Sequence, residues 1–257
     1  MPVMRIGDWM RKAAKLARLA SHPLYRQGIR FGVAAGIEHE RLLLRQPCRT
    51  LVDIGANRGQ FALAARRSWP EAKIYSFEPL AAPCRRFRRL FGEDAQVRLF
   101  PAGIAPVRER RLIHLSRRED SSSLLPIGAQ AEFFPGTEEA GRIEVEVGPL
   151  GDWVSAEEIE GPAFLKIDVQ GFEAEALRGC ATLLDRFAYA YVEASFVALY
   201  QGQALADEVI RFLQGANFRL AGLYNLAYAS TGIAVQGDFF FVREKIAGPT
   251  EARANLP

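Results

Sequence analysis

The sequence is poor in the residues that build disulfide frameworks, metal centres and histidine-dependent nucleophiles. In 257 residues the cysteines are Cys48, Cys84 and Cys180, and the histidines are His22, His39 and His114. No two cysteines form a C-x-x-C pair, and an odd, scattered set argues against both a disulfide framework and a zinc site. We therefore expect reduced thiols in a cytoplasmic protein, with no metal centre and no Ser-His-Asp triad.

Long apolar runs are missing as well. No segment reaches the ~18 apolar residues that a transmembrane helix requires, and the N-terminus lacks the apolar core and cleavage site of a secretory signal. It carries instead a basic amphipathic pattern, in which Trp9, Ala13, Leu16 and Ala17 share one helical face. We expect this face to pack on its own domain, with weak peripheral contact to a membrane as the alternative.

A strong excess of one charge is also absent. The formal net charge is +3, which does not demand a nucleic-acid partner, and we expect none. Hydrophobic residues make up 49% and charged residues 25% of the chain, as in an ordinary globular protein. The length suits one large α/β domain with a short extension. The oligomeric state stays open.

The order of apolar and amphipathic segments predicts the organisation of the chain. Residues 1–46 form an N-terminal helical extension, 47–246 the main domain and 247–257 a C-terminal tail. The predicted strands are 50–54, 73–77, 97–100, 163–169, 188–194, 218–224 and 239–243, and the helices between them are 60–68, 83–91, 173–179 and 204–214. This alternation indicates a mostly parallel sheet with crossover helices.

A different pattern interrupts this alternation in the middle of the chain. Residues 110–115 and 142–147 alternate polar and apolar side chains, as half-buried antiparallel strands do. Region 108–149 is therefore predicted to be a small β insertion, and we expect it to select the acceptor.

The first candidate binding motif is a glycine-rich turn after the strand 50–54. Asp53 ends the apolar run, and Gly55 and Gly59 bracket the turn, where glycine lets the backbone approach a ligand closely. Asn57 also fits, because Asn tolerates a left-handed backbone. The G-x-G-x-x-G spacing of dinucleotide-binding proteins is absent. An acid before the first glycine suits an ammonium group, such as that of a methionine moiety.

A second acid follows the next predicted strand. Glu78 stands in Ser76-Phe77-Glu78-Pro79, at about the distance from the glycine turn at which a carboxylate reaches ribose hydroxyls. A carboxylate can accept both hydrogen bonds of a ribose diol. Together with Asp53, Gly55, Asn57 and Gly59, Glu78 is predicted to bind the cofactor.

Ionisable residues also stand at the ends of two later strands. Lys166 and Asp168 share one side of an apolar strand, and Glu193 ends the strand after it. Buried charges cost several kcal/mol unless they are paired or functional. We interpret Asp168, Lys166 and Glu193 as catalytic candidates. A structural Lys–acid ion pair is the alternative, and it stays open for Lys166.

These motifs resemble the FkbM family of S-adenosylmethionine-dependent methyltransferases. The matching segments are 53–59, 77–79, 121–124, 165–173, Glu193, Leu199-Tyr200, Gly202-Gln203 and 237–242. The resemblance covers about residues 50–243. It implies a Rossmann-like class I methyltransferase fold, with helices on both faces of a seven-stranded sheet whose last strand is antiparallel. One departure is Gly151, which stands where the family usually has the first of two acids, although Asp152 remains.

The resemblance also implies the reaction. The cofactor would be S-adenosylmethionine, and the acceptor a hydroxyl on a sugar, polysaccharide or secondary metabolite. An alcohol needs a positioned base at pH 7, and our hypothesis is that Asp168 accepts the proton or orients the acceptor, with Lys166 or Glu193 tuning it. A Mg²⁺-dependent variant would use Asp168 and Glu193 as ligands, but a third ligand is lacking. A nucleic-acid methyltransferase and a non-catalytic binding protein are the remaining alternatives.

Overall fold

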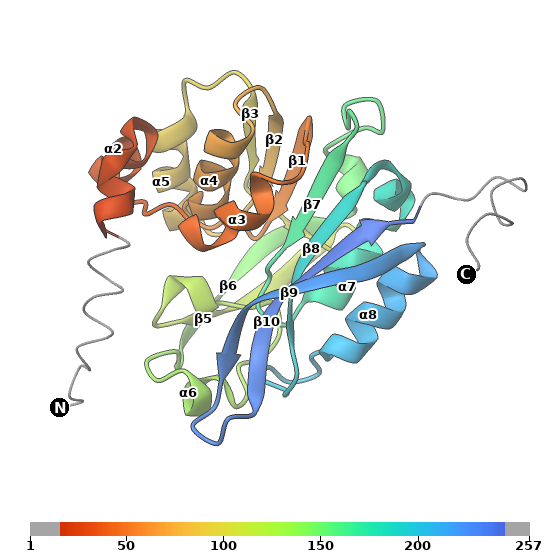
Figure 1. The fold of residues 1–257 in the computed structure, drawn as a ribbon. Helices are drawn as coiled ribbons and strands as arrows, with labels where there is room; N and C mark the ends of the chain where they lie inside the picture. Colours follow the sequence, from red (N-terminus) through yellow and green to blue (C-terminus); the bar gives the residue numbers. More distant parts are fainter. Residues whose placement is uncertain (1–15, 245–257) are drawn as a thin grey trace, which may run out of the picture.

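A seven-stranded sheet forms the centre of the computed structural model, which describes residues 16–244 (Figure 1). Its strands are β1 (Thr50–Ile54), β2 (Lys73–Phe77), β3 (Val97–Phe100), β7 (Ala163–Ile167), β8 (Tyr189–Ser195), β9 (Phe218–Tyr228) and β10 (Ala234–Arg243). The strand order is β3-β2-β1-β7-β8-β10-β9, and β10 runs antiparallel to both neighbours. The predicted α/β fold with an antiparallel last strand is confirmed.

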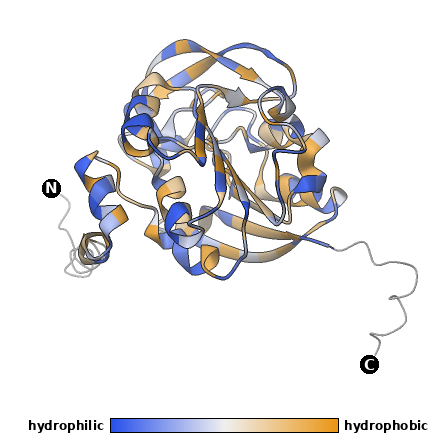
Figure 2. Cartoon of the chain, turned by 90° about the horizontal axis from the view of Figure 1, so that it is seen from above, coloured by the Kyte–Doolittle hydropathy of each residue, from blue (hydrophilic) through white to orange (hydrophobic). Residues whose placement is uncertain are grey.

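Helices cover both faces of this sheet. One face carries α2 (Pro23–Arg30), α3 (Glu40–Leu43), α4 (Gln60–Ser68) and α5 (Ala81–Phe91); the other carries α7 (Glu173–Gly179), α8 (Ala206–Gly215), η3 (Leu150–Asp152) and η4 (Ala181–Arg186). Hydrophobic and hydrophilic residues are interspersed along the helices (Figure 2). In α5, Phe87 and Leu90 are buried, whereas Arg85 and Arg88 are exposed. The arginines of this helix therefore form a solvated face.

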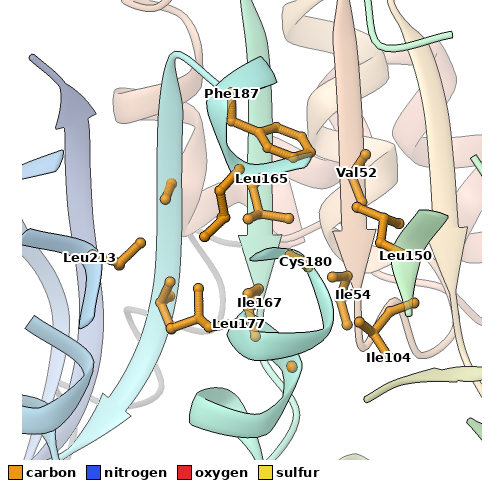
Figure 3. Packing of buried hydrophobic residues seen from close by; sticks show 14 of the residues in the cluster. Val52, Ile54, Ile104, Leu150, Leu165, Ile167, Leu177, Cys180, Phe187 and Leu213 are labelled. Atoms are coloured by element: carbon orange, nitrogen blue, oxygen red, sulfur yellow. The ribbon is translucent and has the colours of Figure 1, made fainter. Parts of the chain in front are cut away.

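Each face of the sheet buries its own hydrophobic core. Because side chains alternate along a strand, Val52 of β1 joins the core under α7 and α8, while Leu51 joins the core under α4. Figure 3 shows the first of these cores, where Leu165 of β7, Leu177 of α7 and Leu213 of α8 gather. Removal of this apolar surface from water is the main favourable contribution to folding.

The predicted β insertion is a second, three-stranded sheet. It consists of β4 (Gly103–Ile104), β5 (Glu109–Ser116) and β6 (Glu139–Gly148), in the order β4-β6-β5, with η2 (Glu119–Ser121) and α6 (Gln130–Phe133) between β5 and β6. β5 and β6 pair antiparallel along most of their length. The insertion lies beside one end of the main sheet (Figure 1).

One strand boundary differs from the prediction in a way that matters for the site. β7 ends at Ile167, whereas the apolar pattern predicts a strand as far as Val169. Gln170 and Gly171 have positive φ angles of 55° and 94°, so the chain leaves the sheet and turns into α7. Apolar character continues past the strand because Val169 packs against the buried cores.

The N-terminal extension contributes side chains to the main core. Residues 16–21 are helical, and the 3-10 turn η1 (Ile37–His39) leads from α2 into α3. Val33, Ala35 and Leu43 are buried in the core under α4. Residues 9–15 of the predicted amphipathic helix and the predicted tail 247–257 lie outside the described residues. Between residues 16 and 244, no helix has the length and apolar character to cross a membrane.

Candidate active site

A cavity of about 370 Å³ opens at the carboxyl ends of β1, β2 and β7. The strand ends contribute Ile54, Phe77 and Asp168, and further walls come from the N-terminal extension (34–39) and the β insertion (103–124). The helices that follow β1 and β7, α4 and α7, cover opposite faces of the sheet. The cavity thus lies at the topological switch point, where α/β sheets bind their ligands.

Glu78 is fixed at the cavity wall by backbone groups. Its Oε2 accepts a hydrogen bond from Asn57 N (2.9 Å) and its Oε1 accepts one from Leu80 N (2.8 Å). The glycine turn is joined to the same strand, because Gly55 N donates to the carbonyl of Phe77 (3.0 Å). Each carboxylate oxygen of Glu78 keeps a lone pair for a further donor. Burial raises the pKa of Glu78 to about 7.

Asn57 also lines the cavity, and it carries a buried acceptor without a partner in the described part of the chain. Its φ of 48° is the left-handed conformation expected from the sequence. The side-chain Oδ1 is buried and has no hydrogen-bond partner among residues 16–244. Because a buried acceptor without a donor costs about 1–3 kcal/mol, this atom marks a position where a ligand donor would be stabilising.

The two glycines of the turn are required for different reasons. Gly55 lines the cavity at φ 78°, and a Cβ there would lie 1.8 Å from the carbonyl oxygen of Asp168. Gly59 does not line the cavity; it caps α4 at φ 93°, and a Cβ there would lie 2.8 Å from Phe91 and 2.9 Å from Phe87. Gly55 therefore lets two turns of the site touch, whereas Gly59 lets α5 pack closely.

Lys166 is buried between two acids of neighbouring strands. Its Nζ lies 3.1 Å from Asp53 Oδ1 and 3.8 Å from Asp168 Oδ2, and it donates to the carbonyl of Gly55 at 2.8 Å. Burial alone would lower the pKa of Lys166, but the carboxylates of Asp53 and Asp168 outweigh burial and raise it. Asp53 is fully buried behind Lys166 and does not line the cavity.

Gln170 connects the ends of β7 and β8. Its Nε2 donates to Asp168 Oδ1 (2.9 Å) and to Glu193 Oε2 (3.0 Å), and its Oε1 accepts from Tyr200 OH (2.9 Å). Glu193 accepts a second hydrogen bond from Gln236 Nε2 (3.1 Å). Burial raises the pKa of Glu193 well above its usual range, and the nearby Asp168 carboxylate adds to this. Glu193 stands behind the cavity wall, in contact with it through Gln170.

The turn that presents Gln170 is held from behind by a buried acid. Glu173 Oε1 accepts from Gly171 N (2.9 Å) and Val169 N (3.2 Å), and burial raises its pKa to about 7. Ser123, from the serine run of the insertion, donates to the carbonyl of Gln170 (2.6 Å). The insertion and α7 thus fix the same turn.

His39, which sequence reasoning treated as one of three scattered histidines, also lines the cavity. Its Nδ1 lies 3.2 Å from Tyr191 OH and 3.6 Å from Asp238 Oδ2. The partners are 152 and 199 residues away in the chain, so no local pattern points to this arrangement. Only the register of β8 and β10 brings them together.

The predicted site residues thus fall into two groups. Those that line the cavity are Gly55, Asn57, Glu78, Lys166 and Asp168, and those that stand behind it are Asp53, Gly59 and Glu193. Among residues 16–244, no three His, Cys, Asp or Glu side chains are arranged to hold a metal ion. An amide, Gln170, bridges the two acids that the magnesium alternative would use.

The strand order and the cavity at the switch point are those of a class I methyltransferase. The sequence model described as "Methyltransferase FkbM domain" matches residues 53–220, and the chain belongs to this family. Over 209 residues it is 26% identical to the 2-O-methyltransferase NoeI of Sinorhizobium fredii (strain NBRC 101917 / NGR234), which covers 78% of this chain and 86% of NoeI.

Solved structures also match over most of the chain. One is the precorrin-6y C5,15-methyltransferase from Geobacter metallireducens GS-15, with 13% identity, a TM-score of 0.45 and coverage of 81% of this chain and 88% of that one. Another is an O-methyltransferase family protein from Burkholderia thailandensis, with 10% identity, a TM-score of 0.44 and coverage of 90% and 63%. These likenesses are remote, and the fold assignment rests on the strand order.

Proposed function

We propose that this methyltransferase transfers a methyl group from S-adenosylmethionine to a hydroxyl oxygen of a sugar, polysaccharide or secondary metabolite. The observation that carries the proposal is the cavity at the switch point, with Glu78 on one wall and Lys166 and Asp168 on another. The similarity to NoeI, a 2-O-methyltransferase, supports oxygen as the acceptor atom.

The residues of the β1–β2 end fit the cofactor. Glu78 offers a lone pair on each oxygen, which suits a ribose diol, and Asn57 offers a buried acceptor without a donor. Gly55 lets the backbone approach. When bound, the cofactor supplies an electrophilic methyl group on a positively charged sulfur.

The residues of β7 act on the acceptor in this proposal. Asp168 is partly exposed (37% of its side chain), so it can accept a hydrogen bond from a hydroxyl and either orient it or take its proton. Lys166 and Gln170 hold Asp168 in place. Asp53 acts through Lys166, and Glu193 acts through Gln170, since neither lines the cavity.

The first test is cofactor binding by the purified protein. Isothermal titration calorimetry is expected to detect S-adenosylmethionine and its demethylated product, with NAD far weaker. A folded protein without affinity for either would contradict the proposal.

The second test is the variant Asp168→Asn, which keeps the shape of the side chain. We expect cofactor affinity to persist, while methyl transfer falls by roughly two to four orders of magnitude, the usual contribution of a positioned acid or base. Transfer of radiolabelled methyl to a panel of methyl glycosides with a free 2-hydroxyl measures this. The exposed Asp185→Asn is the control. Normal turnover of Asp168→Asn would leave Asp168 as a structural partner of Lys166.

A further inference from the structure

A second hydrogen-bond network faces the cavity from the side of the N-terminal extension. His39 stands on the wall, with 19% of its side chain exposed, and Asp238 lies behind it with 13% exposed. Tyr191 OH donates to Asp238 Oδ2 at 2.9 Å, and Asn225 Nδ2 donates to the same oxygen at 2.7 Å. Both His39 and Asp238 lie outside residues 53–220, the range that the family's sequence model matches, although Asp238 belongs to the segment 237–242 that resembles the family.

The backbone of β9 is shaped to complete this network. The pairing of β9 and β10 shifts register between Gln236 and Asp238, which leaves an irregularity opposite Asn225. Asn225 has a φ of 48°, a left-handed conformation that few residues other than glycine adopt. Such bulges re-aim a side chain and cluster near active sites. Here the bulge turns the amide of Asn225 toward Asp238.

The donors of the network determine which nitrogen of His39 carries its proton. Tyr191 directs its hydroxyl hydrogen to Asp238, so its oxygen is free to accept from His39 Nδ1 at 3.2 Å. Asn225 Nδ2 lies 3.3 Å from Nδ1, but its two hydrogens are directed to Asp238 Oδ2 at 2.7 Å and to Tyr191 OH at 3.4 Å, which leaves Nδ1 to donate. With the proton on Nδ1, Nε2 carries a lone pair. Within residues 16–244, Nε2 has no hydrogen-bond partner.

We propose that Nε2 of His39 is the base that takes the proton of the acceptor hydroxyl, and that Asp238 is its positioning residue; this rests on the proposed function. In this step the O–H bond breaks and its proton moves to Nε2. The oxygen forms the new bond to the methyl carbon, and the electron pair of the C–S bond stays on sulfur. The resulting imidazolium is stabilised by the Asp238 carboxylate, 3.6 Å from Nδ1.

The two acids that the sequence predicts to be catalytic are already engaged. Asp168 accepts from Gln170 through Oδ1, and its Oδ2 lies 3.8 Å from the Lys166 ammonium. Glu193 accepts from two amides and does not line the cavity. Asp168 then orients the acceptor, and His39 takes the proton.

The charge state of His39 suits this role. Burial lowers its pKa, and Lys166 acts in the same direction, whereas Asp238, Glu38 and Asp168 raise it. The net shift is downward, so the ring is neutral at pH 7 and able to accept a proton. Loss of the Asp238 charge is expected to lower the pKa of His39 further.

The first experiment reads the tautomer directly and needs no acceptor. Long-range ¹H–¹⁵N spectra of the ¹⁵N-labelled full chain resolve three histidines, and His39→Gln assigns the His39 signals by their loss. We expect a neutral ring with its proton on Nδ1 at pH 7, and a changed tautomer population in Asp238→Asn. A proton on Nε2, or an imidazolium at pH 7, would overturn the proposal.

The second experiment separates proton transfer from cofactor binding. In His39→Ala, methyl transfer to the glycoside panel is expected to fall about 10²- to 10⁴-fold, with an unchanged dissociation constant for S-adenosylmethionine and partial rescue by added imidazole. In Asp238→Asn, the pH profile of turnover, including its maximum, is expected to shift to lower pH, because the pKa of His39 falls further. His22→Ala, at the start of α2 and away from the cavity, is the matched control.

Two outcomes would overturn the assignment of His39. One is a fully active His39→Ala; the other is a variant that loses cofactor affinity but turns over normally at saturating cofactor, which would place His39 on the cofactor. Failure of the proposed function itself looks different, because the wild-type protein would then show no S-adenosylmethionine binding.

Discussion

The two ends of the cavity are built by different kinds of interaction. At the β1–β2 end, formed by Gly55, Asn57 and Glu78, backbone N–H groups hold the functional side chain in place. At the β7–β10 end, side chains hold each other, as Gln170 does for Glu193 and as Tyr191 does for His39. The first end is therefore fixed by the local course of the chain, and the second by the register of separate strands.

This difference has an energetic consequence. A side-chain network in a low-dielectric interior is stable when all its members are paired, and the loss of one member leaves the others unsatisfied. Where backbone N–H groups hold a carboxylate, removal of that carboxylate costs less stability, because the backbone keeps its own conformation. The predictions below test this contrast, from the largest effect to the smallest.

The largest effect is expected for Lys166→Met, which leaves the fully buried Asp53 without its partner. Breaking a buried pair costs about 3–5 kcal/mol, and urea unfolding monitored by circular dichroism measures it. Lys73→Met is the control, because the Lys73–Glu160 pair is exposed and exposed pairs contribute about 0.2–1 kcal/mol. Equal stability of the two variants would mean that the buried pair does not hold the β7 end together.

Much of the fold and one end of the site could be predicted from the sequence. Strand–helix alternation and the turn Gly55–Gly59 are local patterns, and Glu78 follows within 21 residues of Asn57, to which it bonds. Lys166 and Asp168 could be identified because charges are unusual in an apolar strand. The end of β7 could not be predicted, because Val169 continues the apolar pattern after the backbone has turned.

The other end could not be predicted, for a physical reason. His39 and Asn225 lie 186 residues apart, and they meet because β10 inserts antiparallel between β8 and β9. Asn225 reaches Asp238 only through a bulge, which leaves no trace in apolar periodicity. The role of Gly55 was expected to be ligand approach, whereas contact with the carbonyl of Asp168 is an equally strong constraint.

Gly55→Ala tests the contact between the two ends. At φ 78°, a residue other than glycine costs about 1–2 kcal/mol, and overlap with the Asp168 carbonyl adds about 1–3 kcal/mol. Gly202→Ala is the control, because its φ is 76° but a Cβ there meets nothing within 4 Å. We expect urea unfolding to show the larger loss for Gly55→Ala, together with weaker cofactor binding. Equal losses would mean that the turns can separate at no cost.

The pH dependence of stability tests the buried acid behind the β7 turn. The pKa of Glu173 is raised from 4.5 to about 7, so the folded state binds a proton more tightly than the unfolded state does. The free energy of unfolding therefore falls as pH rises through this window, by about 1.4 kcal/mol per pH unit for this group. Glu78 and Glu193 act with the same sign.

We expect Glu173→Gln to flatten this slope, measured by urea unfolding between pH 5 and pH 8. Glu175→Gln, two residues further along the same helix and partly exposed, is the control and is expected to retain the full slope. A wild-type slope in Glu173→Gln would show that Glu173 is charged throughout and that the turn is held by other groups.

The smallest effect is expected for Glu78→Gln, because the backbone at the β1–β2 end keeps its course. The amide retains one acceptor oxygen, so it can satisfy either Asn57 N or Leu80 N, and it offers one hydroxyl-binding oxygen instead of two. We expect the dissociation constant for S-adenosylmethionine to rise by the equivalent of about 1–2 kcal/mol, with little change in unfolding. Calorimetry measures this dissociation constant. The control is Glu71→Gln, which changes an exposed acid before β2. If Glu78→Gln unfolds as readily as Lys166→Met while its affinity is unchanged, Glu78 is a structural residue, and the contrast between the two ends fails.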